Sequence, residues 1–218
     1  MPQKAQTTSL TYESLVGKLV VFEGADGVGK TTLVKALEES LRTAKVNFAS
    51  FAFPGSEEGT IGRLVYDIHH HPAEFGIAKV TAASLQTLHV AAHVDAIETR
   101  IVPALSAGAF VILDRFWWST WVYGIINGVP RSILTPLIKF EKVVWGEIVP
   151  EAVVHLVRPD IKNTALDREY HRLAKRESRV VRVIRVEVHD RVEETLDATI
   201  RALLSERPKI RGVYNNMT

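Results

Sequence analysis

The sequence predicts an α/β fold of the three-layer sandwich type, in which a five-stranded parallel sheet carries helices on both faces. Three observations predict it. Short runs rich in Val, Ile and Leu alternate with longer segments that repeat apolar residues at helical spacing. A glycine-rich turn follows the first apolar run, and an Asp-Arg pair follows the third. Because strands that alternate with helices form parallel sheets covered on both faces, this order of segments favours that architecture.

The first half of the chain alternates strand and helix patterns. An apolar run at 18–22 is typical of a strand buried on both faces, and leucines at helical spacing indicate a helix after it. The turn signal Pro54-Gly55 ends a second apolar run, and Pro72 ends the next helical pattern. The expected elements are a strand at 18–22, a helix at 31–43, a strand at 46–53, a helix at 61–71 and a long helix at 79–105 that bends near Pro103.

The second half continues the alternation and ends in a helix. A third apolar run leads into Asp114, and the alternation of apolar and charged residues at 180–188 is typical of an edge or half-exposed strand. The expected elements are a strand at 109–113, helices at 118–126 and 133–145, a strand at 152–157, a basic helix at 161–176, the strand at 180–188 and a closing helix at 192–204.

Length and composition favour one cytoplasmic domain. With 218 residues, we expect a tail and lead-in at 1–17 (the first nine residues being tail) and a single domain at 18–218. The net charge of +2 is too small to indicate nucleic acid as a partner. The absence of cysteine excludes disulfides and thiolate catalysis and fits a reducing cytoplasm. No signal peptide is expected, because residues 1–18 lack an apolar core. No membrane span is expected, because no apolar run approaches 18 residues.

Residues 24–31 match the phosphate-binding pattern G-x-x-x-x-G-K-[ST]. Glycines let the backbone adopt positive φ, so that successive N–H groups point at one phosphate, and the helix that follows adds its N-terminal partial charge. When a nucleotide polyphosphate binds to a loop of this kind, Lys30 can reach its β- and γ-phosphates, and the Thr31 hydroxyl can hold Mg²⁺. We therefore expect a nucleotide polyphosphate and Mg²⁺ to bind here. The expected nucleotide-binding residues of the loop are Gly24, Ala25, Asp26, Gly27, Val28, Gly29, Lys30, Thr31 and Thr32.

Beyond this loop, the chain resembles the thymidylate kinase family from about 18 to 204. The motifs that carry the resemblance are Phe22-Glu23-Gly24-x-Asp26-Gly27-x-Gly29-Lys30-Thr31-Thr32, Phe53-Pro54, Asp114-Arg115-Phe116, Ser119-Thr120-x-x-Tyr123, Pro150-Glu151 and Ala165-Leu166-x-Arg168. The resemblance implies a P-loop NTPase-type fold, and it implies phosphoryl transfer from ATP to a nucleoside monophosphate. A homodimer is a further expectation.

The resemblance also implies roles for single residues. On the donor side, Lys30 holds the triphosphate, and Asp114 orients Mg²⁺ together with Thr31. A basic helix, with Arg168 and Arg172 among its arginines, matches a short helical lid at about 161–179 that closes over the phosphates. On the acceptor side, the implied contacts are Asp26 with the sugar hydroxyl, Arg115 with the phosphate, Tyr123 and Thr120 with the sugar and base, and Phe53-Pro54 beside them.

The base-reading positions depart from the family pattern. The family reads thymine with a Phe and, four residues later, an Arg, and we assign these positions to Val90 and Val94. Neither valine stacks like a ring or hydrogen-bonds a base carbonyl. The family Arg after Phe-Pro is also missing, with Arg63 as a candidate substitute. Since a site that hydrogen-bonds one base discriminates strongly, these changes indicate dTMP or another, related or modified nucleotide as the acceptor.

Several residues also have purely structural interpretations. Asp114 is alternatively a helix N-cap, Arg115 an ion-pair partner, and Asp26 a turn former. Packing or a subunit contact is the favoured interpretation of the tryptophans at 117, 118 and 121, rather than base stacking. A solvated helix end is the favoured interpretation of the histidines at 69–71. His89 and His93, four residues apart on a helix, are a further candidate contact with substrate.

Two function classes remain at this point. The leading hypothesis is a nucleoside monophosphate kinase with Lys30, Asp114 and Arg115 as its catalytic residues. The alternative is a nucleotide-binding regulatory or assembly protein that keeps the loop and has lost dTMP kinase activity, a hypothesis favoured by the missing base-reading pair and by Glu57-Glu58.

Overall fold

The structure is a computed structural model that describes residues 12–158 and 164–205. The expected tail at 1–9 and the first residues of the expected lid helix, 161–163, lie outside the described residues. Within the lead-in, Tyr12 and Leu15 are buried in the core, with a 3₁₀ turn at Glu13–Leu15. Among the described residues, no helix combines the length and apolarity that crossing a bilayer requires.

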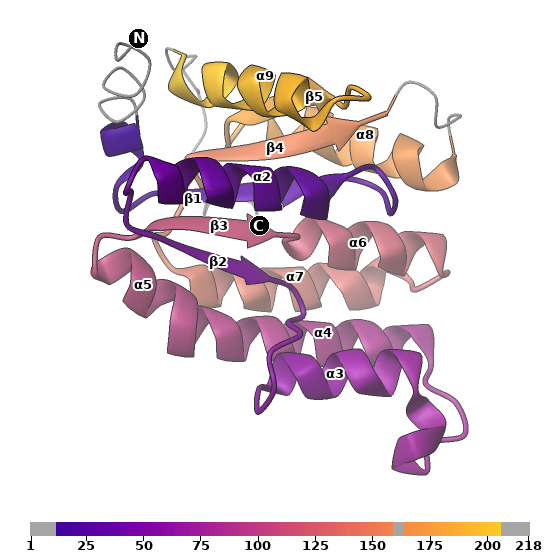
Figure 1. Cartoon of the computed structure of the whole chain (residues 1–218). Coiled ribbons are helices and arrows are strands. Elements are labelled where there is room, and N and C mark those ends of the chain that lie inside the picture. The colour runs from indigo at the N-terminus through magenta and orange to yellow at the C-terminus, as the bar shows by residue number, and fades with distance from the viewer. Residues whose placement is uncertain (1–11, 159–163, 206–218) are drawn as a thin grey trace, which may run out of the picture.

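A five-stranded, fully parallel sheet forms the centre of the fold, as predicted (Figure 1). The strands are β1 (Leu19–Glu23), β2 (Phe48–Ala52), β3 (Phe110–Asp114), β4 (Ala152–Val157) and β5 (Val183–Glu187), in the order β2-β3-β1-β4-β5. β1, β3 and β4 are almost wholly buried, which explains their continuous apolar runs. β5 is an edge strand, which accounts for its alternating pattern.

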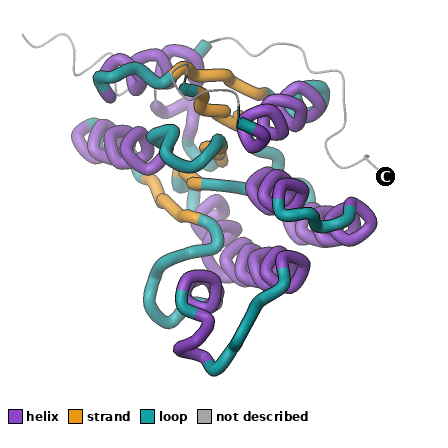
Figure 2. The backbone as a smooth tube through the Cα atoms, turned by 90° about the vertical axis from the view of Figure 1, so that its right-hand side faces the viewer, coloured by secondary structure: helices purple, strands orange, loops and turns teal. Residues whose placement is uncertain are grey.

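Helices cover both faces of this sheet, so the molecule has three layers (Figure 2). α2 (Lys30–Thr43) and α9 (Val192–Leu204) pack together on one face, over a core shared with β1, β3 and β4. The other core is covered by α6 (Trp117–Ile126), α7 (Arg131–Trp145), α8 (Ala165–Glu177) and the helices before β3. The remaining helices are α3 (Ile61–His70), the 3₁₀ helix Pro72–Phe75, α4 (Ala82–Ala96) and α5 (Val102–Ser106).

The expected long helix at 79–105 is interrupted by a π-helical turn at Ile97–Ile101, between α4 and α5. A π-turn inserts one extra residue into the helical repeat and so redirects the axis. Pro103 lies in the first turn of α5, which directly follows the π-turn, and it has no N–H to donate to that turn. The bend thus begins before the proline at which it was predicted.

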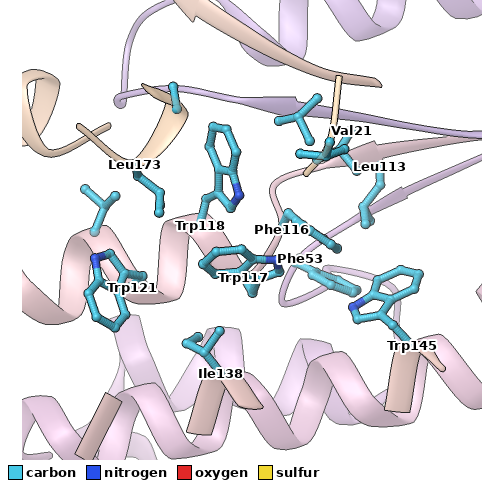
Figure 3. Packing of buried hydrophobic residues seen from close by; sticks show 14 of the residues in the cluster. Val21, Phe53, Leu113, Phe116, Trp117, Trp118, Trp121, Ile138, Trp145 and Leu173 are labelled. Atoms are coloured by element: carbon cyan, nitrogen blue, oxygen red, sulfur yellow. The ribbon is translucent and has the colours of Figure 1, made fainter. Parts of the chain in front are cut away.

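Aromatic side chains fill the core beneath the α6 face of the sheet (Figure 3). Trp117 and Trp118 are completely buried and Trp121 is 8% exposed, so the predicted packing role of this cluster is confirmed. Phe53, Phe116 and Trp145 lie in the same cluster. This core fixes α6, the helix that follows Asp114 and Arg115, against the sheet.

Candidate functional site

The glycine-rich loop connects the end of β1 to the start of α2. Gly24, Gly27 and Gly29 have φ angles of 150°, 74° and 99°, so the predicted positive-φ backbone is present. A Cβ on Gly24 would stand 2.7 Å from the carbonyl oxygen of Leu156, so only glycine fits there without a shift. No side chain caps α2 at Gly29. Its first amides are therefore available to an anion, as in other helix N-termini that bind phosphate.

Lys30 lies over this loop and is bonded to it. Its Nζ donates to the carbonyl oxygens of Gly24 and Ala25, both at 2.8 Å, and the residue is 5% exposed. Burial lowers the pKa of the Lys30 ammonium to about 8, with the positive charge of Arg115 adding to the effect. An anion bound in the loop would oppose both effects and favour the charged ammonium.

Asp114 faces the same loop from the end of β3. In the sheet register Asp114 is the partner of Phe22, one residue before the end of β1. Its Oδ2 accepts a hydrogen bond from Thr31 Oγ1 at 3.1 Å, and its Oδ1 is buried without a hydrogen-bond partner. The N-cap of α6 is Phe116, so the alternative of Asp114 as that cap does not hold. An unpartnered carboxylate oxygen beside a hydroxyl is a donor set that fits Mg²⁺.

A cavity of about 170 Å³ brings the two motifs together. Its lining consists of Asp26, Gly27, Gly29, Lys30, Thr31, Thr32, Asp114 and Arg115. The loop and the acid–arginine pair therefore share one cleft at the carboxyl edge of the sheet, the edge where ligands bind in parallel α/β folds. A larger hollow of about 500 Å³ between α2 and α9 is lined by Ala36, Ser40 and Leu196 among others, none of which belongs to these motifs.

Arg115 adopts a left-handed backbone conformation, with φ of 75°. Its guanidinium donates to the carboxylate of Asp26 and, at 3.0 Å, to the hydroxyl of Ser119. The hydroxyl of Tyr123 also donates to Asp26. Burial by itself would raise the pKa of Asp26, but the Tyr123 hydrogen bond and the Arg115 charge outweigh it and hold the pKa below its ordinary value. Asp26 is thus an ionised carboxylate that accepts hydrogen bonds from both Arg115 and Tyr123 and orients them.

Glu23, the last residue of β1, lies fully buried beneath this arginine. One carboxylate oxygen accepts from the backbone N–H of Phe116 at 2.7 Å and of Ser119 at 3.1 Å, and the other from the Ser119 hydroxyl at 2.8 Å. Burial raises the pKa of Glu23 to about 7, despite the opposing charge of Arg115. Our sequence interpretation gave Glu23 no role. The signal in the sequence that could have indicated a role is that a charged residue, Glu23, ends an otherwise apolar strand.

On the acceptor side, α4 contacts Phe53 through a histidine. The ring of His93 stacks on Phe53 with centroids 3.9 Å apart, and its Nδ1 lies 2.9 Å from Oε2 of the buried Glu141 on α7. His89, one turn earlier, is half-buried, and its Nε2 is a buried atom with no hydrogen-bond partner. Of the two valines assigned to base reading, Val90 is buried and Val94 is half-buried.

The remaining residues predicted to contact the acceptor differ in burial and in hydrogen bonding. The Phe53-Pro54 peptide bond is cis. Thr120 is buried on α6, and its hydroxyl has no hydrogen-bond partner. Arg63 is paired with Asp67 on its own helix, with Nε and Oδ2 2.8 Å apart. The described geometry therefore gives Arg63 a structural partner, whereas the Thr120 hydroxyl is left with an unused hydrogen-bonding group.

The basic helix α8 packs firmly on α6. Tyr170, Leu173 and Ala174 are buried in the tryptophan-rich core, while Arg172 on the opposite side pairs with Glu169 at 3.2 Å. Arg168 lies in the first turn of α8. Among the described residues, no group of histidines and acids is arranged to hold a metal ion, and His70 and His71 are exposed at the end of α3.

Comparison with known proteins identifies one family. The family model described as thymidylate kinase matches residues 22–195. A thymidylate kinase of Nitrobacter winogradskyi is 34% identical over 149 residues, and one of Thermoanaerobacter sp. is 33% identical over 141 residues. These alignments cover 67% and 64% of this chain, and 61% and 65% of the two relatives, so the chain spans less than two thirds of their length. The crystal structure of a thymidylate kinase from Ehrlichia chaffeensis superposes with a TM-score of 0.67 at 20% identity, covering 87% of this chain and all of the other.

Proposed function

Because the chain belongs to the thymidylate kinase family, we propose that it transfers the γ-phosphoryl group of ATP to a nucleoside monophosphate. The observation that carries this proposal is the shared cleft, in which Lys30 and the loop amides face Asp114 and Arg115. Transfer of a phosphoryl group depends mainly on positioning and on neutralising negative charge. A lysine, an arginine and a helix N-terminus around one cavity supply both.

The donor half of this mechanism uses the loop. Its amides and Lys30 bind the β- and γ-phosphates and balance the charge that moves between them. The hydroxyl of Thr31 and the carboxylate of Asp114 are the groups that hold Mg²⁺, which when bound neutralises the same phosphates. Binding of phosphate would release the Lys30 ammonium from the loop carbonyls that it contacts in this structure. Arg168 and Arg172 of α8 are the further candidates for donor contacts.

The acceptor half uses Arg115. A guanidinium grips a phosphate through two parallel hydrogen bonds, and Arg115 lines the cleft beside the loop. The acceptor phosphate attacks directly, so no strong general base is required. Asp26 and Tyr123 are proposed to contact the sugar, and Phe53 and Thr120 the base side.

The acceptor itself is dTMP or a related or modified nucleotide. Val90 and Val94 offer no hydrogen bonds to a base, while α4 presents His93 to Phe53 and leaves Nε2 of His89 unbonded. A kinase with this set of groups is expected to discriminate among bases differently from one with the Phe and Arg of the family pattern. A cytoplasmic location and a homodimer also belong to this proposal. The alternative of a regulatory protein without kinase activity has no support in the comparisons.

A coupled assay for ADP release tests the proposal. Purified protein is incubated with ATP, Mg²⁺ and, one at a time, dTMP, dUMP, dCMP, dAMP, dGMP and their ribose counterparts. The proposal predicts that ADP release requires one acceptor or a small set of acceptors and that the matching diphosphate accumulates. Slow ATP hydrolysis that is the same with every acceptor, or none at all, would overturn it.

A further inference from the structure

We propose that Ser119 and Tyr170 are positioning residues for Arg115, so that the packing of α8 sets how this arginine meets the acceptor phosphate. The inference rests on the proposed function, because it assigns Arg115 to that phosphate. Its structural content is independent of the reaction: a buried hydroxyl pair holds the guanidinium from the side opposite to Asp26. Ser119 lies on α6 and Tyr170 on α8, 51 residues apart in sequence.

The hydroxyl of Ser119 has three partners, and their chemistry fixes its hydrogen bonds. When Glu23 is ionised, Ser119 donates to it at 2.8 Å and accepts from the guanidinium of Arg115 at 3.0 Å. A serine hydroxyl has one proton and two lone pairs, so the remaining lone pair is available to the Tyr170 hydroxyl, which lies 2.8 Å away. Tyr170 is therefore the donor. Every hydrogen-bonding position of Ser119 is in use, and rotation of the hydroxyl would break at least one of these bonds.

Tyr170 is a fixed donor because burial holds it neutral. The residue is completely buried, and this burial, with the negative charge of Glu23 nearby, keeps the pKa of its phenol well above the ordinary value. The Tyr170 ring also lies edge-on to Tyr123, with centroids 6.5 Å apart. Tyr170 therefore contacts two residues of the acceptor side, Ser119 directly and Tyr123 through its ring.

Arg115 needs such support, because its own backbone is strained. A φ of 75° places this arginine in the left-handed region, which is unfavourable for a residue with a Cβ. The backbone after it is anchored by Glu23, which accepts from the N–H groups of Phe116 and Ser119. Ser119 then returns one turn later to hold the guanidinium itself. The Glu23 carboxylate thus holds the backbone after Arg115 directly and the Arg115 guanidinium through the Ser119 hydroxyl.

Contacts with both α6 and α7 hold α8 in place. Glu177 near its end is buried and pairs with Lys142 of α7, with Nζ and Oε2 3.6 Å apart. Glu169 accepts from the Trp121 indole of α6 at 3.3 Å. These contacts hold α8 against α6 and α7, so the packing of α8 sets the place of the Tyr170 hydroxyl relative to Ser119. The Ser119 hydroxyl therefore links Tyr170 on α8 to the guanidinium of Arg115.

Tyr170→Phe tests this coupling, with Tyr12→Phe as a matched control. Each change removes one hydroxyl from a buried tyrosine bonded to a serine, Ser40 in the case of Tyr12 at 3.0 Å. In the presence of the acceptor identified by the panel, Tyr170→Phe is expected to lose about three- to tenfold in kcat/KM for the acceptor, with KM for ATP within about twofold. Tyr12→Phe is expected to change neither. Equal effects of the two variants would overturn the proposal.

A double-mutant cycle tests that Tyr170 acts through Ser119. If it does, Ser119→Ala combined with Tyr170→Phe is no worse than Ser119→Ala alone, because the shared bond is lost only once. Losses that multiply would contradict the proposal.

Arg115 is also followed directly by NMR of its guanidinium ¹⁵N signals, assigned by their absence in Arg115→Lys. Faster rotation or solvent exchange in Tyr170→Phe, but not in Tyr12→Phe, is expected, and unchanged signals would refute the positioning role. This readout needs no phosphoryl transfer, so it stands even if the acceptor panel overturns the proposed function.

Discussion

Arg115 at the end of β3 donates a hydrogen bond to the carboxylate of Asp26 in the glycine-rich loop, which lies 89 residues earlier in the sequence. This pair joins the glycine-rich loop directly to the turn that follows β3. It also fixes the arginine before any phosphate binds, because Asp26 holds one side of the guanidinium and Ser119 the other. The catalytic geometry that we propose is therefore largely preorganised, which reduces the cost of binding the transition state.

Replacement of Asp26 by Asn is expected to raise KM for the acceptor about tenfold while leaving thermal stability nearly unchanged. The Asp26 side chain is 67% exposed, and exposed ion pairs contribute less than about 1 kcal/mol to folding. Its effect on the arginine is local and electrostatic, so it is felt in acceptor binding. The measurement is steady-state kinetics together with a melting curve, with Glu39→Gln, which removes an exposed partner of Arg42 on α2, as the control. An Asp26→Asn variant that melts far lower with unchanged KM would contradict this assignment.

Substitutions at Asp114 and Thr31 are expected to change the Mg²⁺ requirement. Asp114→Asn removes the charge of a carboxylate whose Oδ1 has no protein partner, so activity should need at least about tenfold more Mg²⁺. Thr31→Val should do the same, whereas Thr31→Ser, which keeps the hydroxyl, should remain close to the parent protein. The check is a Mg²⁺ titration of the initial rate at fixed ATP. Identical titration curves for Thr31→Val and Thr31→Ser would remove Thr31 from the proposed metal site.

The buried carboxyl of Glu23 predicts a distinctive pH dependence of stability. Its pKa is about 7 in the folded protein against 4.5 as the reference value, so the folded state holds a proton that the unfolded state has lost between these values. The contribution is therefore fully present below pH 4.5 and is lost as the pH rises through 7, by on the order of 3 kcal/mol.

The free energy of unfolding, measured by urea denaturation from about pH 4.5 to about pH 8 for the parent and for Glu23→Gln, isolates this contribution from that of other titrating groups. The parent is expected to lose stability relative to the Gln variant across that range. A constant difference between the two proteins would show that Glu23 does not titrate there.

The glycine loop predicts a graded response to alanine. At Gly24, a Cβ would meet the carbonyl oxygen of Leu156 at 2.7 Å, and φ is 150°; at Gly27, nothing lies within 4 Å, and only the φ of 74° opposes a side chain. Gly27→Ala should therefore cost about 1–2 kcal/mol, and Gly24→Ala clearly more. Chemical denaturation of both variants measures the difference. Equal costs would mean that the close approach to Leu156 is not a constraint.

The sheet and the backbone of the glycine-rich loop were predictable because both follow from local patterns. The motif at 24–31 specifies its own backbone, and the apolar run before Asp114 identifies a strand end. Parallel strands place their carboxyl ends on one edge, so the loop and Asp114 had to be neighbours once both strands belonged to one sheet. The edge position of β5 followed from its alternating pattern in the same way.

Contacts between distant helices were not predictable from these patterns. The stacking of His93 on Phe53 depends on how α4 crosses the end of β2, which the π-turn after α4 helps to set. The pairing of Ser119 with Tyr170 depends on the packing of α6 against α8. Apolar periodicity identifies the buried face of a helix, but not which residue of another helix it meets. The stacking of His93 on Phe53 and the contacts that hold Arg115 therefore emerged only from the structure.

Transfer of label from [γ-³²P]ATP tests the central claim most directly. With the acceptor selected by the panel, the parent protein is expected to move the label into the nucleoside diphosphate. Lys30→Met is expected to abolish this transfer while its circular dichroism and melting temperature show an intact fold. Full transfer by a folded Lys30→Met variant, or label appearing only as inorganic phosphate whatever acceptor is present, would contradict the account.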